Sequence, residues 1–339
     1  PIVSFLNGAA LSAPIGGLQT LTVRFDNVPD ATPDSNVGYS PYINLILPTN
    51  GADGAGTGPG SPVNDGVAYL GAIYLGVPFG PSDQWVQEFP ANGTITHPFS
   101  KDAAGNPLTV TGTPGETLVV LRLPFGSFTP DQTAADVQVN LRVSSFADLG
   151  VPLNVQASGG FAYGLDPLVN PGTDSPVFGP AASLAITPTV IAVDVDYVGP
   201  EQETATGPSY PREWLVKALI ADGQTVTGLT LRDSMPDGTF ITGVSIVNGT
   251  GVATFDQATG EVTANFTGSY TGGGPVPTLK IEFYVPEFLR NGTTPVLDPV
   301  TGAFRTLENN ARLDATWDPT DSRDPIQVFA LNPVGPEDI

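Results

Sequence analysis

The chain has no cysteine and a single histidine, His97, among its 339 residues. These absences exclude thiol chemistry and any zinc site built from cysteine and histidine. A Ser/His/Asp triad would have to use His97, but no Gly-x-Ser-x-Gly elbow occurs. His97 precedes Pro98 in a turn-like context, so we expect it at a strand end or on the surface. A glycosidase would need two catalytic carboxylates, and no sequence feature singles out such a pair among the many acids. We therefore predict that the protein is not an enzyme.

Basic residues are also scarce. Lys and Arg number 12 against 34 Asp and Glu, which gives a formal net charge of −22. This charge argues against nucleic acid and against anionic membrane surfaces as partners. No apolar run is long enough to cross a bilayer, so we expect no membrane insertion. Charged residues are only 14% of the chain, so we expect Thr, Ser, Asn, Gln and Gly to cover most of the exterior.

The absence of cysteine bears on location as well. Small secreted modules of eukaryotes usually depend on disulfides, whereas many bacterial surface proteins are larger sandwiches without them. The chain shows no signal peptide, and Pro1 cannot be an initiator, so we interpret it as a mature or excised product. We expect an extracellular or cell-surface protein of bacterial origin.

What the chain has in quantity is glycine and proline, 40 and 35 residues, without a collagen period. Asn-Gly and Asp-Gly, the dipeptides that favour tight hairpin turns, occur repeatedly between alternating runs of apolar and polar residues. Strong alternation, typical of half-buried strands, marks five segments: residues 18–26, 116–125, 136–144, 278–285 and 309–317. No segment has a convincing helical period. The sequence therefore predicts an all-β chain of short antiparallel strands joined by long Gly/Pro/Asp-rich loops.

A short internal repeat predicts how the strands are divided. Val198-Gly199-Pro200-Glu201 recurs as Val334-Gly335-Pro336-Glu337, 136 residues later (334 − 198), and the apolar alternation before the motif recurs with it. This spacing is about one domain length. We therefore predict two tandem β-sandwich domains, residues 1–188 and 189–339, with a strand-plus-linker unit used once per domain and the chain as a piece of a longer array.

The second half resembles a known family. A strand over Trp214–Ile220 is followed by Asp222-Gly223-Gln224 and by a Thr-rich strand that ends in an acidic residue before Pro236; a late strand, Leu279–Val285, and Asn310-Ala311 at the start of the last core strand complete the pattern. This order is similar to that of the conserved-repeat domain of bacterial cell-surface proteins. The resemblance implies an Ig-like or transthyretin-like sandwich from exported, modular, non-catalytic adhesins, stalks or filaments.

The many acids suggest calcium, because Asp-rich loops offer the oxygen ligands that this ion prefers. Three groups are candidates: Asp26, Asp30 and Asp34 in one loop; Asp194, Asp196, Glu201 and Glu203 at the junction of the domains; and Asp318, Asp321 and Asp324 near the end. None has EF-hand spacing. The alternative, that these acids serve turns, caps and solubility, stays open. No cofactor is expected to be required, and Ca²⁺ is a hypothesis.

Some surface sandwiches related to this family contain an isopeptide bond between a Lys of a first strand and an Asn of a last strand beside a buried acid. The resemblance implies Lys217 with Asn309 or Asn310 as the corresponding residues. Lys217 also shares a strand face with Leu215 and Leu219, which is unusual for a solvated lysine. A lysine that extends its amine to solvent from such a position is the alternative.

Two functions are compatible with these features. The first is a structural or adhesive protein whose subunits self-associate, with strand addition between subunits as its sharper form; the donors would be Ile2, Val3 and Phe5, or Ile326, Val328, Phe329 and Leu331. Pairing of each terminal strand within its own domain is the competing interpretation. The second function is a lectin-like or Ca²⁺-dependent module that binds surface glycans on exposed aromatic residues, namely Tyr39, Tyr42, Tyr69, Tyr74 and Trp85.

Overall fold

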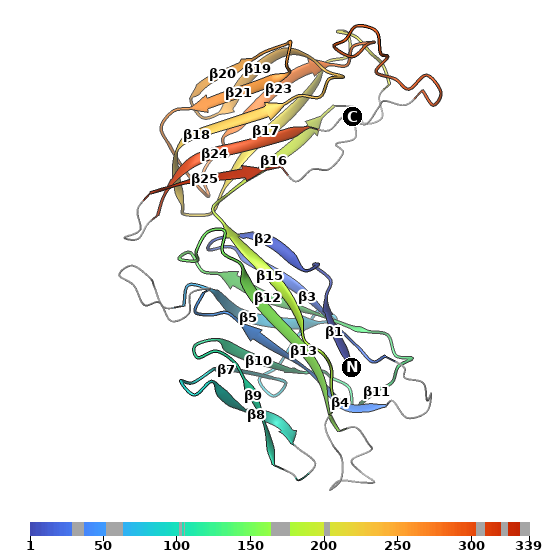
Figure 1. Cartoon of the computed structure of the whole chain (residues 1–339), viewed down its shortest axis with the longest axis vertical. Helices are drawn as coiled ribbons and strands as arrows, with labels where there is room; N and C mark the ends of the chain where they lie inside the picture. The colour runs from blue at the N-terminus through green and yellow to red at the C-terminus, as the bar shows by residue number, and fades with distance from the viewer. Residues whose placement is uncertain are drawn as a thin grey trace. The chain divides into compact units, whose positions relative to one another are not determined.

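The computed structural model describes residues 1–28, 37–51, 64–101, 104, 106–163, 177–199, 204–302, 309–319 and 325–332. These residues form strands β1 to β25 and no helix (Figure 1), so the prediction of an all-β chain built mainly of antiparallel sheets is confirmed. The chain divides into two compact units, Pro1–Thr189 and Val190–Ile339. The division falls between β15 and β16, inside the stretch 189–203 that the repeat marks as a junction.

The first unit contains two large sheets and a hairpin. The smaller sheet has the order β1 (Ile2–Phe5), β3 (Leu18–Asp26), β12 (Ala135–Val143), β5 (Val67–Tyr74) and β6 (Val77–Pro78). The larger has the order β2 (Ala10–Pro14), β15 (Ala182–Thr189), β13 (Leu153–Tyr163), β4 (Gly38–Leu47), β10 (Thr117–Arg122) and β7 (Gln84–Glu88), with β11 (Ser127–Phe128) beside β4 and β14 (Val177–Phe178) beside β13. The hairpin pairs β8 (Thr94–Lys101) with β9 (Pro107–Thr111).

Alternation in the sequence decides which side chains of β3 and β12 enter the core. Leu21, Val23 and Phe25 of β3 are completely buried, and the Thr and Arg residues between them are not. Strand β4 differs because it is buried on both faces: Leu45 enters the main core, while Tyr42 joins a second cluster with Phe89, Ile95, Leu118 and Val120. This cluster includes residues of the β8–β9 hairpin, so the hairpin covers the outer face of β4 and β10.

The second unit is a two-sheet sandwich. One sheet has the order β16 (Ile191–Val198), β17 (Arg212–Ile220), β23 (Thr278–Tyr284) and β19 (Phe240–Asn248). The other has the order β20 (Gly251–Phe255), β21 (Glu261–Phe266), β18 (Thr225–Ser234), β24 (Asn310–Asp318) and β25 (Ile326–Leu331), with β22 (Ser269–Thr271) beside β18. Trp214 of β17 and Trp317 of β24 are buried in its core, and Trp214 packs 4.7 Å from the ring of Phe283.

The two copies of the internal repeat are not equivalent in this fold. The first copy forms β16, which begins the second unit and pairs with β17; the second forms β25, which pairs with β24 in the other sheet of the same unit. The prediction of one strand-plus-linker unit per domain is therefore wrong. The repeated alternation occurs in two strands with different surroundings: β16 buries Ile191, Val193 and Val195, whereas every residue of β25 is exposed or half-buried. The second Val-Gly-Pro-Glu motif lies outside the described residues.

Candidate functional site

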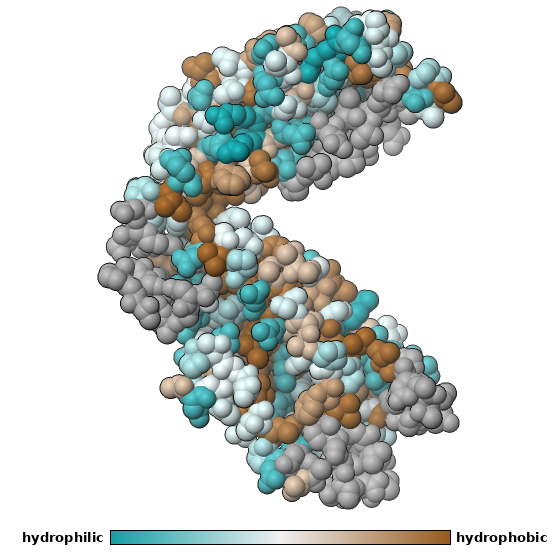
Figure 2. Space-filling model, viewed as in Figure 1, coloured by the Kyte–Doolittle hydropathy of each residue, from teal (hydrophilic) through white to brown (hydrophobic). Residues whose placement is uncertain are grey.

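Strand β25 forms an open apolar edge of the second unit. It pairs with β24 on one side, from Arg312↔Leu331 to Trp317↔Ile326, and no described strand pairs with its other side. Its side chains stay largely exposed: 42% for Ile326, 64% for Phe329 and 60% for Leu331. Figure 2 shows hydrophobic side chains at the surface along this edge, next to hydrophilic residues of the same sheet. An edge strand of this kind is a template for pairing with another chain.

Some backbone hydrogen-bonding groups of β25 point to its open side, where no described strand pairs with them. The Asn332 N–H donates to the Ala311 carbonyl at 2.9 Å, which fixes the phase of the antiparallel ladder. Because N–H groups alternate in direction along such a strand, those of Gln327, Phe329 and Leu331 point away from β24. We define the β25 edge as Ile326, Gln327, Phe329 and Leu331. It offers both apolar side chains and backbone donors that no described strand pairs with.

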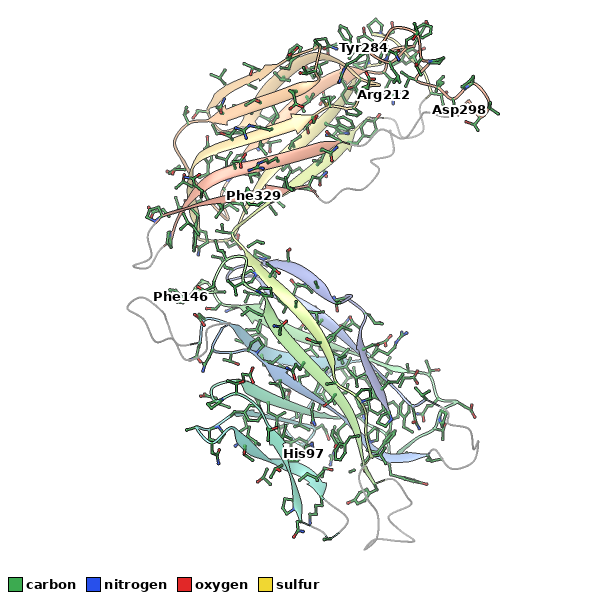
Figure 3. The ribbon with its side chains drawn as sticks, in the orientation of Figure 1. His97, Phe146, Arg212, Tyr284, Asp298 and Phe329 are labelled. Atoms are coloured by element: carbon green, nitrogen blue, oxygen red, sulfur yellow. The ribbon has the colours of Figure 1, made fainter. Side chains whose placement is uncertain are left out.

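A charged ladder supports this edge. The Arg312 guanidinium lies over the Phe329 ring, 5.0 Å from its centroid. Figure 3 labels Phe329 on this strand. Arg312 also donates to Asp314 at 2.6 Å, and Asp314 accepts a second ion pair from Arg232 at 3.0 Å. A cation over an exposed aromatic face contributes about 0.5–1 kcal/mol. Phe329 pairs with Asp314 on the outer face of the sheet, and the Arg312 cation adds a contact to its exposed ring there.

The N-terminal donor candidates lie in β1, which completes a sheet of the first unit. Ile2 pairs with Asp26, Val3 with Phe25 and Phe5 with Val23. Val3 is buried, so β1 contributes to the core of its own unit. Both terminal strands, β1 and β25, thus pair within their own units in this structure, as the competing interpretation expected. Donation to a neighbour would have to break these ladders, whereas the β25 edge could accept a strand without breaking any.

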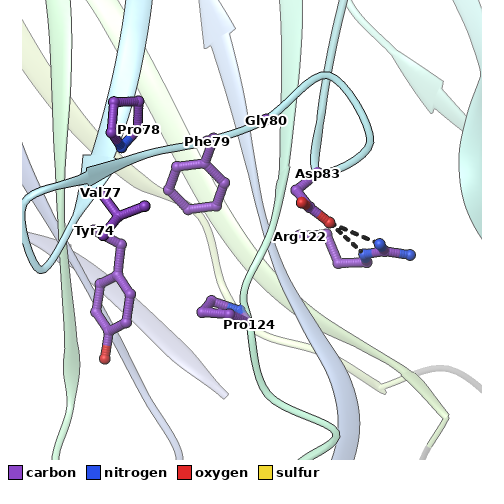
Figure 4. Close-up of a pocket in the computed structure, with 8 residues that line it drawn as sticks. All are labelled: Tyr74, Val77, Pro78, Phe79, Gly80, Asp83, Arg122 and Pro124. Carbon is purple, nitrogen blue, oxygen red and sulfur yellow. Dashed lines mark hydrogen bonds and ion pairs between the residues drawn. The ribbon is translucent and has the colours of Figure 1, made fainter.

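A small pocket lies in the first unit beside the β5–β6 hairpin (Figure 4). Its lining is mostly apolar, with one ion pair: Tyr74, Val77, Pro78, Phe79, Gly80, Asp83, Arg122 and Pro124. Arg122 donates to Asp83 Oδ1 through Nη2 at 2.7 Å and through Nε at 3.2 Å. The hairpin tip next to it exposes Leu75, whose φ of 49° is unusual for a residue other than glycine. An apolar ring-lined pocket with a fixed charged pair can hold one ring-sized group.

The other aromatic candidates do not form an exposed platform. Tyr42 is completely buried in the cluster under the β8–β9 hairpin, so the prediction of its exposure is wrong. Trp85 packs against the same cluster, and Tyr69 donates to Gln84 Oε1 at 2.8 Å. Tyr39 is half-buried. Aromatic rings in these alternating strands fill the core because burying a ring is strongly favourable. Only Tyr74 of the five lines the pocket.

The calcium candidates are only partly described. Asp30, Asp34, Glu201, Glu203, Asp321 and Asp324 lie outside the described residues. Asp194 and Asp196 both accept from the Lys217 ammonium, with Asp194 Oδ2 at 3.3 Å, so a calcium ion there would have to replace it. Asp26 and Asp318 are far apart in the sequence and in different units. The described residues contain no group of three or more potential metal ligands, and calcium binding stays a prediction.

The isopeptide candidates are placed on different faces of the second unit. Lys217 lies on the outward face of β17, where its ammonium pairs with Asp194 and Asp196. Asn310 is exposed, whereas Asn309 is buried and donates to Asp233. Intact mass tests the predicted bond, because its formation would remove one ammonia. The sequence does carry a signal for Asp233: it takes an inward position after Leu229 and Leu231, where an apolar residue is expected.

His97 is buried, not on the surface or at a strand end, so that expectation is wrong. It lies within β8, its ring 4.7 Å from Tyr42, and its Nδ1 accepts the Ser100 N–H at 2.9 Å (Figure 3). Burial lowers the pKa of His97 to about 4, so the imidazole is neutral near pH 7. The sequence could not show this, because the second layer over β4 exists only in the folded unit.

No protein-family model matches the sequence, and none of the curated proteins is detectably similar to it. Weak likenesses link the chain to solved structures of bacterial surface proteins. The C-terminal domain of the Streptococcus pyogenes antigen I/II-family protein AspA is 9% identical, with 98% of each chain covered and a TM-score of 0.30. A C-terminal fragment of the major pilin GBS80 of Streptococcus agalactiae is 11% identical, over 97% of this chain and 90% of that one, with a TM-score of 0.29.

A third such structure is BcpA, the major pilin subunit of Bacillus cereus. It is 11% identical over 96% of this chain and 65% of that one, with a TM-score of 0.28. Scores of this size do not establish a common fold or function, so the proposal below depends on this chain's own strands and surfaces. The described residues include no helix with the length and apolar character needed to span a membrane.

Proposed function

We propose that this protein is a non-catalytic structural or adhesive component of a bacterial cell surface, and that it self-associates through the β25 edge. The observation that carries the proposal is the combination of exposed Phe329 and Leu331 with outward N–H groups on the same strand. Most natural sheets protect such an edge with charge, proline or a covering loop. A second copy of the chain is the occupant proposed here, through antiparallel pairing of two β25 strands about a two-fold axis.

Charge limits how this association can form. A net charge of −22 makes copies repel one another at long range. Salt shortens the range of this repulsion, and the Debye screening length is about 10 Å at 0.1 M. The edge itself carries the Arg312 cation next to Phe329 and lacks an acid on its four residues. Contact at the β25 edge therefore brings apolar groups together with little local repulsion. We expect association to strengthen as salt is raised, the opposite of an assembly held by ion pairs.

The experiment is analytical ultracentrifugation combined with electron microscopy of the full chain, with Phe329→Glu as the test variant. Val300→Glu is the matched control, because Val300 is 91% exposed and lies in the turn after Asp298, outside β25. Dimers or longer assemblies are expected for the wild type and for Val300→Glu, and monomers for Phe329→Glu. If the wild type stays monomeric up to high micromolar concentration in high salt, association through this edge is ruled out.

A ligand-binding role is the second candidate, and the pocket beside the β5–β6 hairpin favours it. The rings of Tyr74 and Phe79, with a nearby arginine–aspartate pair, suit a sugar ring, whose apolar face and hydroxyls need both kinds of contact. A glycan array probed with the wild type and with Phe79→Ala tests it. Tyr39→Ala is the control, since Tyr39 does not line the pocket. Binding lost in Phe79→Ala alone would support the lectin-like alternative, and no binding at all would remove it.

A further inference from the structure

Two buried polar side chains in the core of the second unit are only half-satisfied. Asp233 of β18 and Asn309, which directly precedes β24, are each 1% exposed. The Asn309 amide donates from Nδ2 to Asp233 Oδ2 at 3.0 Å. The other two oxygens, Asp233 Oδ1 and Asn309 Oδ1, are enclosed and have no hydrogen-bond partner. One added hydrogen, on the carboxyl group, would give this pair of side chains the donor that its two unpartnered acceptors lack.

Among the described residues, no cation of the surrounding strands donates to Asp233 Oδ1 or Asn309 Oδ1. On the neighbouring strands, Arg232 and Arg312 bind Asp314 on the outer face of the sheet. The facing strand β17 carries Arg212, which is buried but donates to Tyr197 Oη and to the Ala205 carbonyl. Its Lys217 binds Asp194 and Asp196, and its Glu213 accepts from Lys280.

Strand β21, which also pairs with β18, brings a negative charge near Asp233 and therefore does not favour its ionised form. Glu261 accepts from the Ser234 hydroxyl at 2.8 Å, and its negative charge disfavours a second one at Asp233. Arg290, from a later loop, is turned to backbone carbonyls, including that of Met235. A buried carboxylate with a single neutral hydrogen bond and no cation is costly by several kcal/mol.

We propose that Asp233 is a neutral carboxylic acid in the folded unit, that its O–H donates to Asn309 Oδ1, and that this acid–amide pair makes the second unit lose stability as the pH rises toward neutrality. The added proton supplies the one donor that the two orphaned oxygens lack. Carboxylic acid and amide are complementary, since each then donates once and accepts once. The pair joins β18 to the start of β24, the strand that carries β25, but the proposal does not depend on self-association.

The direction of the pH dependence follows from the raised pKa of Asp233 in the folded unit. Burial raises the pKa of Asp233 from 3.8 to about 7, the Asn309 hydrogen bond opposes this, and Glu261 adds to it. A folded-state pKa above the unfolded one means that the folded unit binds the proton more tightly. The stabilisation is therefore complete below pH 3.8 and is lost as pH rises to about 7. The folding equilibrium constant changes by up to tenfold per pH unit within that window.

The test is urea unfolding of the full chain at several pH values between 4 and 8, read by fluorine NMR with 5-fluorotryptophan. Trp214 and Trp317 report on the second unit, and Trp85 reports on the first in the same sample. In Asp233→Asn, an amide permanently takes the role of the neutral acid. In this variant we expect the folding equilibrium constant of the second unit to stay level between pH 4 and 7. At pH 8 we expect that constant to be at least tenfold larger than in the wild type.

Asp222→Asn is the matched control, because Asp222 is exposed in the turn before β18 and Asn-Gly fits that turn equally well. It should keep the wild-type pH dependence. Parallel curves for wild type and Asp233→Asn would overturn the proposal. If Asp233→Asn fails to fold, the carbon-13 titration of the wild-type Asp carboxyls decides: one carboxyl must titrate near pH 7, and titration of all of them below pH 5 contradicts the proposal.

Discussion

The indole Nε1 of Trp317 donates to Oε1 of Gln224 at 3.0 Å, with both side chains buried in the second unit. This bond ties the end of β24, where its pairing with β25 begins, to the turn that precedes β18. Gln224 itself closes that turn, because its N–H donates to the Ala221 carbonyl at 3.0 Å. Gln224 therefore holds a core tryptophan through its side chain and closes the turn through its backbone N–H.

Gln224→Met should lower the free energy of unfolding of the second unit by about 1–3 kcal/mol, because the indole N–H would stay buried with that acceptor lost. Methionine keeps the length and volume of the side chain, so cavity formation contributes little. The measurement is urea unfolding followed through Trp317. Gln87→Met, at an exposed position of β7, is the control and should change stability by less than about 0.5 kcal/mol. An equal loss in both variants would contradict the role of the bond.

The first unit should respond to pH in the opposite direction from the second. Burial lowers the pKa of His97 from 6.5 to about 4, so its stabilising contribution is complete above pH 6.5 and is lost as pH falls to about 4. His97→Gln should remove this dependence, read through the fluorine signal of Trp85, which packs against the same cluster. The free energy of unfolding of the first unit is plotted against pH for both proteins. In the wild type its slope should reach about 1.4 kcal/mol per pH unit. Equal slopes in variant and wild type would show that His97 does not titrate in this way.

The backbone of β25 gives a prediction independent of its side chains. Gln327→Pro removes an N–H that points away from β24, so the ladder to β24 keeps all its hydrogen bonds. We expect the variant to stay folded but to lose dimers and longer assemblies in sedimentation. Val328→Pro, one residue on, removes an N–H that points toward β24, and should destabilise the hairpin itself. Unchanged assembly in Gln327→Pro would mean that copies do not pair through this backbone.

Close packing at Gly38 should make even a methyl group costly. A Cβ there would lie 2.1 Å from Cδ2 of Phe161, within the core of the first unit. Gly38→Ala should therefore destabilise this unit by about 1–3 kcal/mol through overpacking. Gly126→Ala is the control, since a Cβ at Gly126 meets nothing within 4 Å. Thermal unfolding of the two variants gives the comparison, and a neutral Gly38→Ala would show that Phe161 can move aside.

Calcium binding can be tested by thermal unfolding and by native mass spectrometry. If one of the acidic groups binds Ca²⁺, the melting temperature should rise with added calcium and fall with chelator, by RT ln(1 + [L]/Kd) in free energy. For the group at Asp194 and Asp196, Lys217→Ala should strengthen the effect, because it removes the ammonium that both carboxylates now share. No shift in melting temperature, with no bound metal by native mass spectrometry, would remove the hypothesis.

The sequence by itself determined the class of fold and the main core. In β3 the alternation of Leu21, Val23 and Phe25 with polar residues was enough, because a strand with one apolar face must bury that face. Asn-Gly and Asp-Gly turns, and the shortage of helical periods, fixed the all-β character. These signals are local, so the chain contains them before it folds.

Only the tertiary structure decided what lies beside each strand. It buried Tyr42 and His97 under a second layer, paired both terminal strands within their own units, and placed the two copies of the repeat in different sheets. It also brought Asn309 to Asp233 across 76 residues of sequence. Such contacts depend on long-range strand pairing, and a period of two residues specifies which face is apolar but not which strand will cover it.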